Sequence, residues 1–183
     1  MEIIDIIETV KSALKSLYTN DLILLQLDVS ERAITHKLAE YIQTILPKES
    51  YHVDCEYNKD IGDPKRMCIE LEDNANKQIE HLPEHIQNEV KAMLIYPDIV
   101  IHNRKSDLAN LCVIELKKNA HSPKSLTHDD SKLKCYTSRY KYEVGLLLII
   151  NTGKSVDHAT VNVYIYQNGK QLNDAPDNWS IAT

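Results

Sequence analysis

Two segments of the sequence place charged side chains near the ends of otherwise apolar stretches. The first is 96–102, which contains Asp98, and the second is 111–118, which contains Glu115 and Lys117. Successive side chains of a strand point to opposite faces, so Glu115 and Lys117 lie on one face of the second segment. If the two segments pair, Asp98 and Glu115 converge on one point, with Lys117 beside them. Carboxylate oxygens suit a hard divalent cation, so the pattern is typical of a metal site with an adjacent positive charge.

The elements that would position these side chains follow from the hydrophobic periodicity. Both segments alternate apolar and polar residues as half-buried strands do, and 103–110 is polar enough to form the turn of a hairpin. Apolar residues at helical spacing predict one helix over 3–17 and another over 31–46. Ser30 is a typical N-cap for the second helix, and Pro47 ends it.

Glu31 opens the second of these helices, and its position has two explanations. An acid in the first turn compensates the helix dipole, which requires no further role. Glu31 also precedes the apolar Ile34 by three residues, so its side chain lies on the buried face of the helix. From there it would reach the metal site, and the sequence leaves both explanations open.

The rest of the chain contains further candidate strands and helices. We expect strands over 51–58, 143–151 and 159–167, a helix from Asp129 or Asp130 to about Tyr140, a short helix over 84–94, and a peripheral tail over 171–183. The run 22–27 is either a strand or a packed connection. Range 59–77 has no sustained period, and we interpret 59–95 as an insertion between the first two strands. The order predicts an α/β fold, with an extra N-terminal helix before a central sheet flanked by helices.

Length and composition indicate an ordinary globular protein. The 183 residues, 43% hydrophobic and 26% charged, fit a single domain over 1–183. No apolar run reaches the roughly 18 residues that a membrane span needs, and the acidic start at Glu2 does not resemble a signal peptide. The four cysteines show no CxxC spacing, which favours reduced thiols. We therefore expect a cytoplasmic protein with no membrane partner.

The net charge of −6 does not favour nucleic acid, but it is unevenly distributed. Range 103–142 has nine Lys or Arg against four acids, a local charge of +5 that leaves −11 for the remainder. Phosphate binding requires a local basic face rather than a basic protein. The alternative is a solvated charged surface, which composition alone favours.

Pro97-Asp98 and Glu115-Leu116-Lys117 resemble the paired motifs of the PD-(D/E)XK nuclease superfamily, with sixteen residues between the two acids. The resemblance implies a restriction-endonuclease-like αβββαβ core with a central mixed sheet, spanning about 31–166. It also implies that Asp98 and Glu115 hold Mg²⁺, or Mn²⁺ in its place, and that the Leu116 carbonyl completes the shell. Lys117 would orient the attacking water or stabilise charge on the phosphate. Many members carry a further acid on the helix before the sheet, where Glu31 stands here.

The helix after the second motif carries a further resemblance. In several exonuclease branches of the superfamily a QxxxY pair on this helix contacts the substrate. Here the matching residues are Lys132 and Tyr136, with Lys in place of Gln. Together with Lys118 and Arg139 they are the expected substrate contacts, binding phosphates without reading sequence. The alternative is a surface lysine and a packed tyrosine.

These residues favour a metal-dependent nuclease that hydrolyses phosphodiester bonds, with DNA as the expected partner and a homodimer as a compatible assembly. A second hypothesis is a catalytically silent module of the same fold that binds nucleic acid or protein. A third is an α/β domain in which the two motifs coincide by chance. The presence of Asp98, Glu115 and Lys117 together favours activity, because a decaying site usually loses one of them first.

Overall fold

The structure, a computed structural model, forms two compact units. The first comprises residues 1–57 and 97–183, and the second comprises residues 58–96. The residues that the structure describes are 1–59, 65–68, 83–84, 92–119, 123–154, 156 and 160–181. The range 59–95, which the sequence predicts as an insertion, lies within the second unit.

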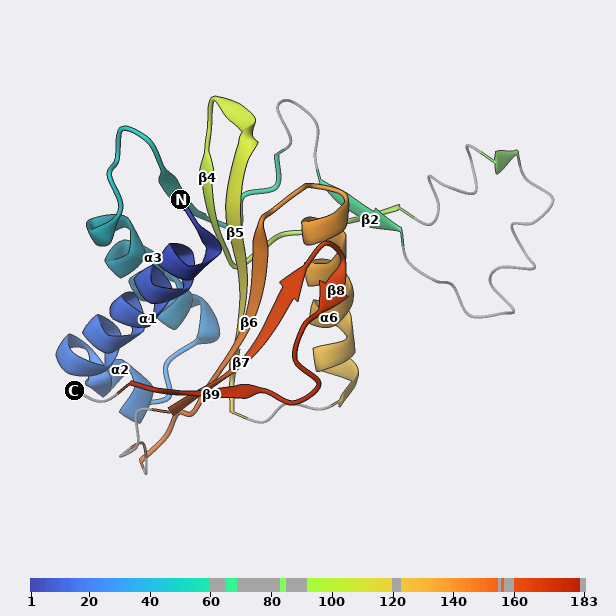
Figure 1. The fold of residues 1–183 in the computed structure, drawn as a ribbon. Helices are drawn as coiled ribbons and strands as arrows, with labels where there is room; N and C mark the ends of the chain where they lie inside the picture. Colours follow the sequence, from blue (N-terminus) through green and yellow to red (C-terminus); the bar gives the residue numbers. More distant parts are fainter. Residues whose placement is uncertain are drawn as a thin grey trace. The chain divides into compact units, whose positions relative to one another are not determined.

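A mixed, open sheet forms the centre of the first unit (Figure 1). Its described strands are β1 (His52–Cys55), β4 (Ile99–Asn103), β5 (Ser106–Lys118), β6 (Val144–Ile150), β7 (Thr160–Gln167), β8 (Lys170–Gln171) and β9 (Asp177–Ser180). Their order is β1-β4-β5-β6-β7-β8, with β9 paired to β7. Among the described strands only β5 and β6 run parallel, and α6 (Pro123–Ser138) connects them as a crossover helix. The predicted α/β class with a mixed sheet and flanking helices is confirmed.

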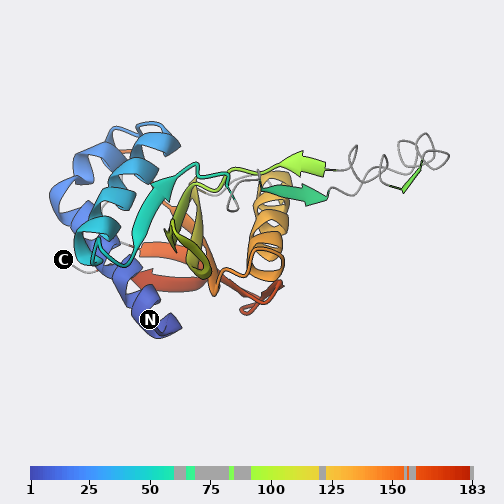
Figure 2. The same ribbon diagram turned by 90° about the horizontal axis from the view of Figure 1, so that it is seen from above.

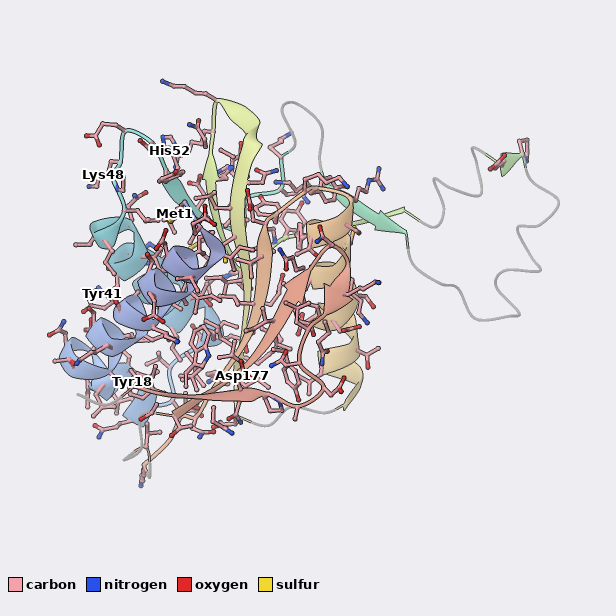
Figure 3. All side chains as sticks on the ribbon, in the orientation of Figure 1. Met1, Tyr18, Tyr41, Lys48, His52 and Asp177 are labelled. Carbon is pink, nitrogen blue, oxygen red and sulfur yellow. The ribbon has the colours of Figure 1, made fainter. Side chains whose placement is uncertain are left out.

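Helices cover both faces of this sheet. The helices α1 (Ile3–Asn20), α2 (Leu22–Gln26) and α3 (Glu31–Ile45) lie on one side, and α6 lies on the other (Figure 2). Apolar side chains of α1, α3 and the facing strands form one buried cluster, and they fill the space between the helices and the sheet (Figure 3). None of the helices that the structure describes is long and apolar enough to cross a membrane.

Local sequence signals explain why these elements form. The Ser30 hydroxyl accepts a hydrogen bond from the Ala33 amide at 3.2 Å, so the predicted N-cap of α3 is confirmed. Every residue of β6 is buried, as expected for a strand covered on both faces. The run 22–27, left open between a strand and a connection, forms the short helix α2 over Leu22–Gln26.

Two predicted boundaries around the hairpin and the following helix are wrong. The helix α6 begins at Pro123, so neither Asp129 nor Asp130 is its cap. Proline is well suited to a first helical turn, because its fixed φ fits the helix and its missing N–H is not needed there. The strand β5 begins at Ser106, so the hairpin turn is much shorter than the predicted loop over 103–110.

The C-terminal segment is part of the sheet rather than a peripheral tail. Strand β9 pairs antiparallel with β7, and Trp179 and Ile181 are both buried in the core. The polar residues between 171 and 178 obscured these two apolar anchors in the sequence. The second unit holds a two-stranded sheet of β2 (Arg66–Cys68) and β3 (Ala92–Leu94). The predicted helix over 84–94 is therefore wrong at its C-terminal end, and 85–91 lies outside the described residues.

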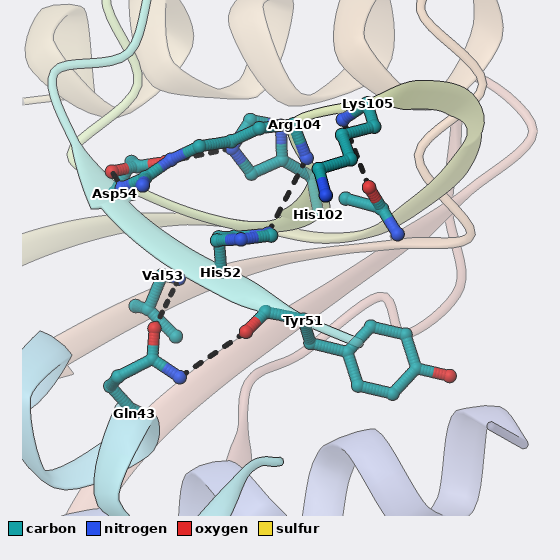
Figure 4. Close-up of polar contacts among 9 residues, drawn as sticks. Gln43, Tyr51, His52, Val53, Asp54, His102, Arg104 and Lys105 are labelled. Carbon is teal, nitrogen blue, oxygen red and sulfur yellow. Dashed lines mark hydrogen bonds and ion pairs between the residues drawn. The ribbon is translucent and has the colours of Figure 1, made fainter. Parts of the chain in front are cut away.

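The strand β1 is at one edge of the sheet, and side chains secure it on both sides (Figure 4). Gln43 of α3 donates to the Tyr51 carbonyl at 3.3 Å and accepts from the Val53 amide at 3.0 Å. These are the bonds that a neighbouring strand would make, so they cover part of the exposed edge. On the other side, Asp54 accepts hydrogen bonds from Arg104 and is 2.8 Å from Nε2 of the buried His102.

Replacing Asp54 tests this cross-strand network. Burial alone would raise the pKa of Asp54, but the hydrogen bonds and positive charges of His102 and Arg104 hold it well below its usual range. A lowered folded-state pKa stabilises the fold above the unfolded value of about 3.9, and this stability is lost as the pH falls through the folded value. We expect Asp54→Asn to lower the free energy of unfolding by about 1–2 kcal/mol at pH 7. The difference should shrink below about pH 4 in urea titrations.

The exposed Asp177 provides a control for this measurement. Asp177→Asn should change the free energy of unfolding by less than about 0.5 kcal/mol at either pH. A cost of Asp54→Asn that is equal at pH 7 and pH 3 would contradict the electrostatic explanation.

Candidate functional site

The register of the β4–β5 hairpin brings the two motif acids together. Ile99 pairs with Ile114 in antiparallel register. Asp98, which precedes Ile99, and Glu115, which follows Ile114, therefore stand opposite each other on one face. Asp98 Oδ2 accepts a hydrogen bond from the Leu116 amide at 2.7 Å, which fixes the first acid against the strand of the second. Burial raises the pKa of Asp98 above its ordinary value, against the opposing effects of this bond and of neighbouring lysines. The ionised form of Asp98 therefore carries a cost in the folded state.

Glu115 is fully buried and has one lysine partner. Its Oε2 lies 2.6 Å from Nζ of Lys132, whereas its Oε1 is buried and has no hydrogen-bond partner among the described residues. Burial raises the pKa of Glu115 to about 8, and the charges of Asp98 and Asp129 add to the increase while Lys132 opposes it. Burying a carboxylate oxygen without a hydrogen-bond partner destabilises the fold. Unsatisfied buried groups with a shifted pKa are typical of functional sites.

Lys117 is held between carboxylates from two helices. Its Nζ lies 3.0 Å from Glu31 Oε1 and 3.4 Å from Asp129 Oδ2, and it also donates to the Leu116 carbonyl at 3.3 Å. Burial alone would lower the pKa of Lys117, but Asp129, Glu31 and Asp98 raise it above its ordinary value. Lys117 is therefore a fixed positive charge next to Asp98 and Glu115.

Glu31 reaches the site, which bears on the two explanations that the sequence left open. Besides its contact with Lys117, its Oε2 accepts a hydrogen bond from the Lys118 amide at 3.3 Å. The carboxylate therefore bridges the start of α3 and the end of β5, beyond any interaction with the helix dipole. The Lys118 ammonium donates to Asp28 Oδ1 at 2.7 Å and to the Val29 carbonyl at 2.8 Å. It thus ties β5 to the segment before α3.

The helix α6 contributes to the site because it packs closely on the sheet. A Cβ at Gly145 of β6 would lie 3.2 Å from side-chain atoms of both Leu133 and Thr137, so the absent side chain permits this approach. Lys132 and Tyr136 are both buried, and the Tyr136 hydroxyl has no hydrogen-bond partner among the described residues. The charge of Glu115 contributes to a raised pKa of Tyr136, after burial as the main cause, so the two groups are neighbours.

Two residues differ from their expected places. Arg139 is exposed and lies over the ring of Tyr140, 5.5 Å from the ring centroid, and no contact brings it to Asp98 or Glu115 in the described residues. Asp129, expected as a helix cap, is buried and 3% exposed, with its carboxylate beside Lys117. The available signal was its spacing, because Asp129 precedes Lys132 by three residues and so shares its helix face.

A pocket of about 520 Å³ opens onto two of the site acids. It lies between the start of α3 and the end of β1, and Glu31 and Asp98 form part of its wall. Arg32 and Glu56 also line it and form an ion pair of 2.7 Å between exposed side chains. Glu56 is therefore engaged with Arg32 at the surface.

The charges and unpaired oxygens of the site fit a hard cation. Four carboxyl groups, from Glu31, Asp98, Glu115 and Asp129, face two ammonium groups, so the site has a formal charge of −2 when all four are ionised. The raised pKa values of Glu115 and Asp98 show that this state is unfavourable without a further cation. The unpartnered Glu115 Oε1 is a vacant oxygen ligand next to Asp98. Within the described residues, no three His, Cys, Asp or Glu side chains are gathered as a ready-made ligand set. The two lysines occupy several of the oxygens that a cation would use.

Asp98→Asn tests whether this charge excess serves a ligand. Asparagine retains an oxygen that can accept the Leu116 N–H and removes a charge whose burial is unfavourable. In metal-free buffer at pH 7, we expect a free energy of unfolding equal to wild type or higher by about 1 kcal/mol. Mn²⁺ at about 100 times its Kd should stabilise the wild type by about 2.7 kcal/mol but not the variant, as measured by calorimetric unfolding. Asp28→Asn, which changes the exposed partner of Lys118, should retain the response to Mn²⁺.

No family model matches this chain, and neither a curated protein nor a solved structure matches it.

Proposed function

We propose that this chain is a metal-dependent nuclease of the PD-(D/E)XK type that hydrolyses phosphodiester bonds in DNA. The order α3-β1-β4-β5-α6-β6 agrees with the restriction-endonuclease-like core that the motifs resemble. The observation that carries the proposal is the meeting of Asp98 and Glu115 on one sheet face, with Lys117 fixed next to them. Three residue types in this arrangement match the needs of phosphodiester hydrolysis.

Asp98 and Glu115 are the residues that would hold Mg²⁺ or Mn²⁺, with the Leu116 carbonyl as a further oxygen ligand. A bound divalent cation supplies polarisation of the phosphate and a lower pKa of bound water. The formal charge of −2 and the unpartnered Glu115 Oε1 support this assignment.

The remaining residues have roles that follow from their contacts. Lys117 supplies positive charge where negative charge develops on the phosphate, and Glu31 holds its ammonium in place. Lys132 forms an ion pair with Glu115 and is the substrate contact that we assign to α6. Tyr136, one turn after Lys132 on α6, is fully buried. The other expected phosphate contacts are Lys118, which pairs with Asp28, and Arg139, which is exposed just after the end of α6.

Lys117→Met tests the catalytic assignment. The change keeps the apolar stem and removes the ammonium, so we expect a loss of roughly 10²-fold or more in the rate of DNA cleavage with Mg²⁺. The control is Lys134→Met, which removes a more exposed lysine paired with Asp130 at 2.8 Å. Cleavage is followed on plasmid and on single-stranded DNA. A wild-type protein that cleaves neither DNA nor RNA with any divalent metal would rule out the nuclease.

The second candidate is a catalytically silent module of the same fold, and the ion pairs supply the observation in its favour. Five of the basic residues between 103 and 142 already pair with acids: Arg104, Lys117, Lys118, Lys132 and Lys134. The local excess of positive charge is thus smaller on the surface than in the sequence. Metal binding without cleavage of any nucleic acid would select this alternative.

Lys132→Gln separates a metal site from a self-contained ion pair. The lysine ammonium and a metal ion compete for the Glu115 carboxylate, because Oε2 is only 2.6 Å from Nζ. Removing a unit charge about 4 Å from a cation is worth up to about 4 kcal/mol at an effective dielectric constant near 20. We expect at least about tenfold tighter binding of Mn²⁺ in titration calorimetry, together with weaker DNA binding. Unchanged or weaker Mn²⁺ binding would argue against Glu115 as a ligand.

A further inference from the structure

Asp129 has the burial and contacts of a site residue rather than of a helix cap. It lies within α6, well past the first turn at Pro123, so it cannot satisfy the free amides of the helix start. Its side chain is 5% exposed, and its Oδ2 is buried with no hydrogen bond among the described residues. A carboxylate in the middle of a helix normally faces water, whereas that of Asp129 is buried. A buried carboxylate is unfavourable unless a positive charge lies beside it.

The carboxylate of Asp129 lies between the two lysines of the site. Its Oδ2 is 3.4 Å from Nζ of Lys117, and its Oδ1 is 4.0 Å from Nζ of Lys132. Lys117 belongs to the sheet, whereas Lys132 belongs to α6, so one carboxylate influences cations from two elements. The neighbouring Asp130 instead pairs with Lys134 at 2.8 Å, with both side chains more exposed.

Lys117 therefore has a carboxylate on each side. Glu31 approaches from α3 at 3.0 Å, and Asp129 approaches from α6 at 3.4 Å. A lysine side chain has many rotamers, and one anion fixes its ammonium less well than two anions from different elements. Glu31 lies at the edge of the pocket, with 32% of its side chain exposed, whereas only 5% of the Asp129 side chain is exposed. Asp129 is therefore the support that is better shielded from water.

We infer that Asp129 is a positioning residue that fixes the ammonium groups of Lys117 and Lys132 beside Asp98 and Glu115. This inference rests on the proposed function for its catalytic consequence, but the contacts themselves are independent of activity. Asp129 acts through the two lysines and holds no substrate itself. Its loss would displace a charge that must be correctly placed, which typically costs about 10²-fold in rate.

The test uses Asp129→Asn, which keeps the shape and removes the charge, and Asp130→Asn as the matched control. Lysine ammonium groups that are held by carboxylates give resolved proton–nitrogen signals in NMR spectra, which need neither metal nor DNA. We expect Asp129→Asn to shift or broaden the signals of Lys117 and Lys132, and Asp130→Asn to affect that of Lys134 alone. Unaltered Lys117 and Lys132 signals in Asp129→Asn would overturn the inference.

Kinetics provide the second readout. We expect Asp129→Asn to lower kcat by about 10²-fold with little change in KM, and to have a smaller effect in a Lys117→Met background, where only the contact with Lys132 remains. Equal losses in both backgrounds would overturn a role through Lys117. If Asp129→Asn does not fold, the carboxyl carbon shift of Asp129 in Lys117→Met tests the same contact, and an unchanged shift would overturn it. A wild-type protein without nuclease activity would count against the proposed function, while the NMR signals still decide on the contact.

Discussion

The structure depends on keeping several carboxylates at the edge of an apolar sheet, where isolated charges are unfavourable. The fold meets this constraint with cations from two elements, Lys117 on β5 and Lys132 on α6. These contacts require β4, β5, α3 and α6 to meet at one corner, and the Asp98 bond to the Leu116 amide fixes the hairpin there. The same contacts therefore hold this corner together and assemble the candidate site.

The sequence predicted the parts of this arrangement that local patterns encode. The pattern over 96–102 and 111–118 predicted two strands, and the expectation that they pair brought Asp98 close to Glu115, as the register confirms. The helix periodicity and Ser30 cap located the start of α3, and with it Glu31. Lys132 was also found, through the resemblance of Lys132 and Tyr136 to the QxxxY pair of some PD-(D/E)XK nucleases.

The sequence could not predict contacts that depend on how the elements pack. Asp129 fits a helix cap by every local criterion, and only the earlier start at Pro123 and the close approach at Gly145 turn it toward Lys117. Trp179 was overlooked for a similar reason, because its polar neighbours conceal a strand that forms only by pairing with β7. In both cases the deciding interaction joins segments that are distant in the chain.

The chain contains its own comparison between a structural ion network and the candidate site. Both carboxylate oxygens of Asp54 have partners, in His102 and Arg104, and the pKa of Asp54 is held below its usual range, so that network stabilises an ionised acid. Glu115 instead keeps an unpartnered buried oxygen and has a raised pKa, so its ionised form destabilises the fold. A hydrophobic residue of similar size in place of Glu115 would avoid that cost. The unpartnered oxygen and the raised pKa of Glu115 therefore distinguish this corner from the Asp54 network, and they are the features that the proposed cation site requires.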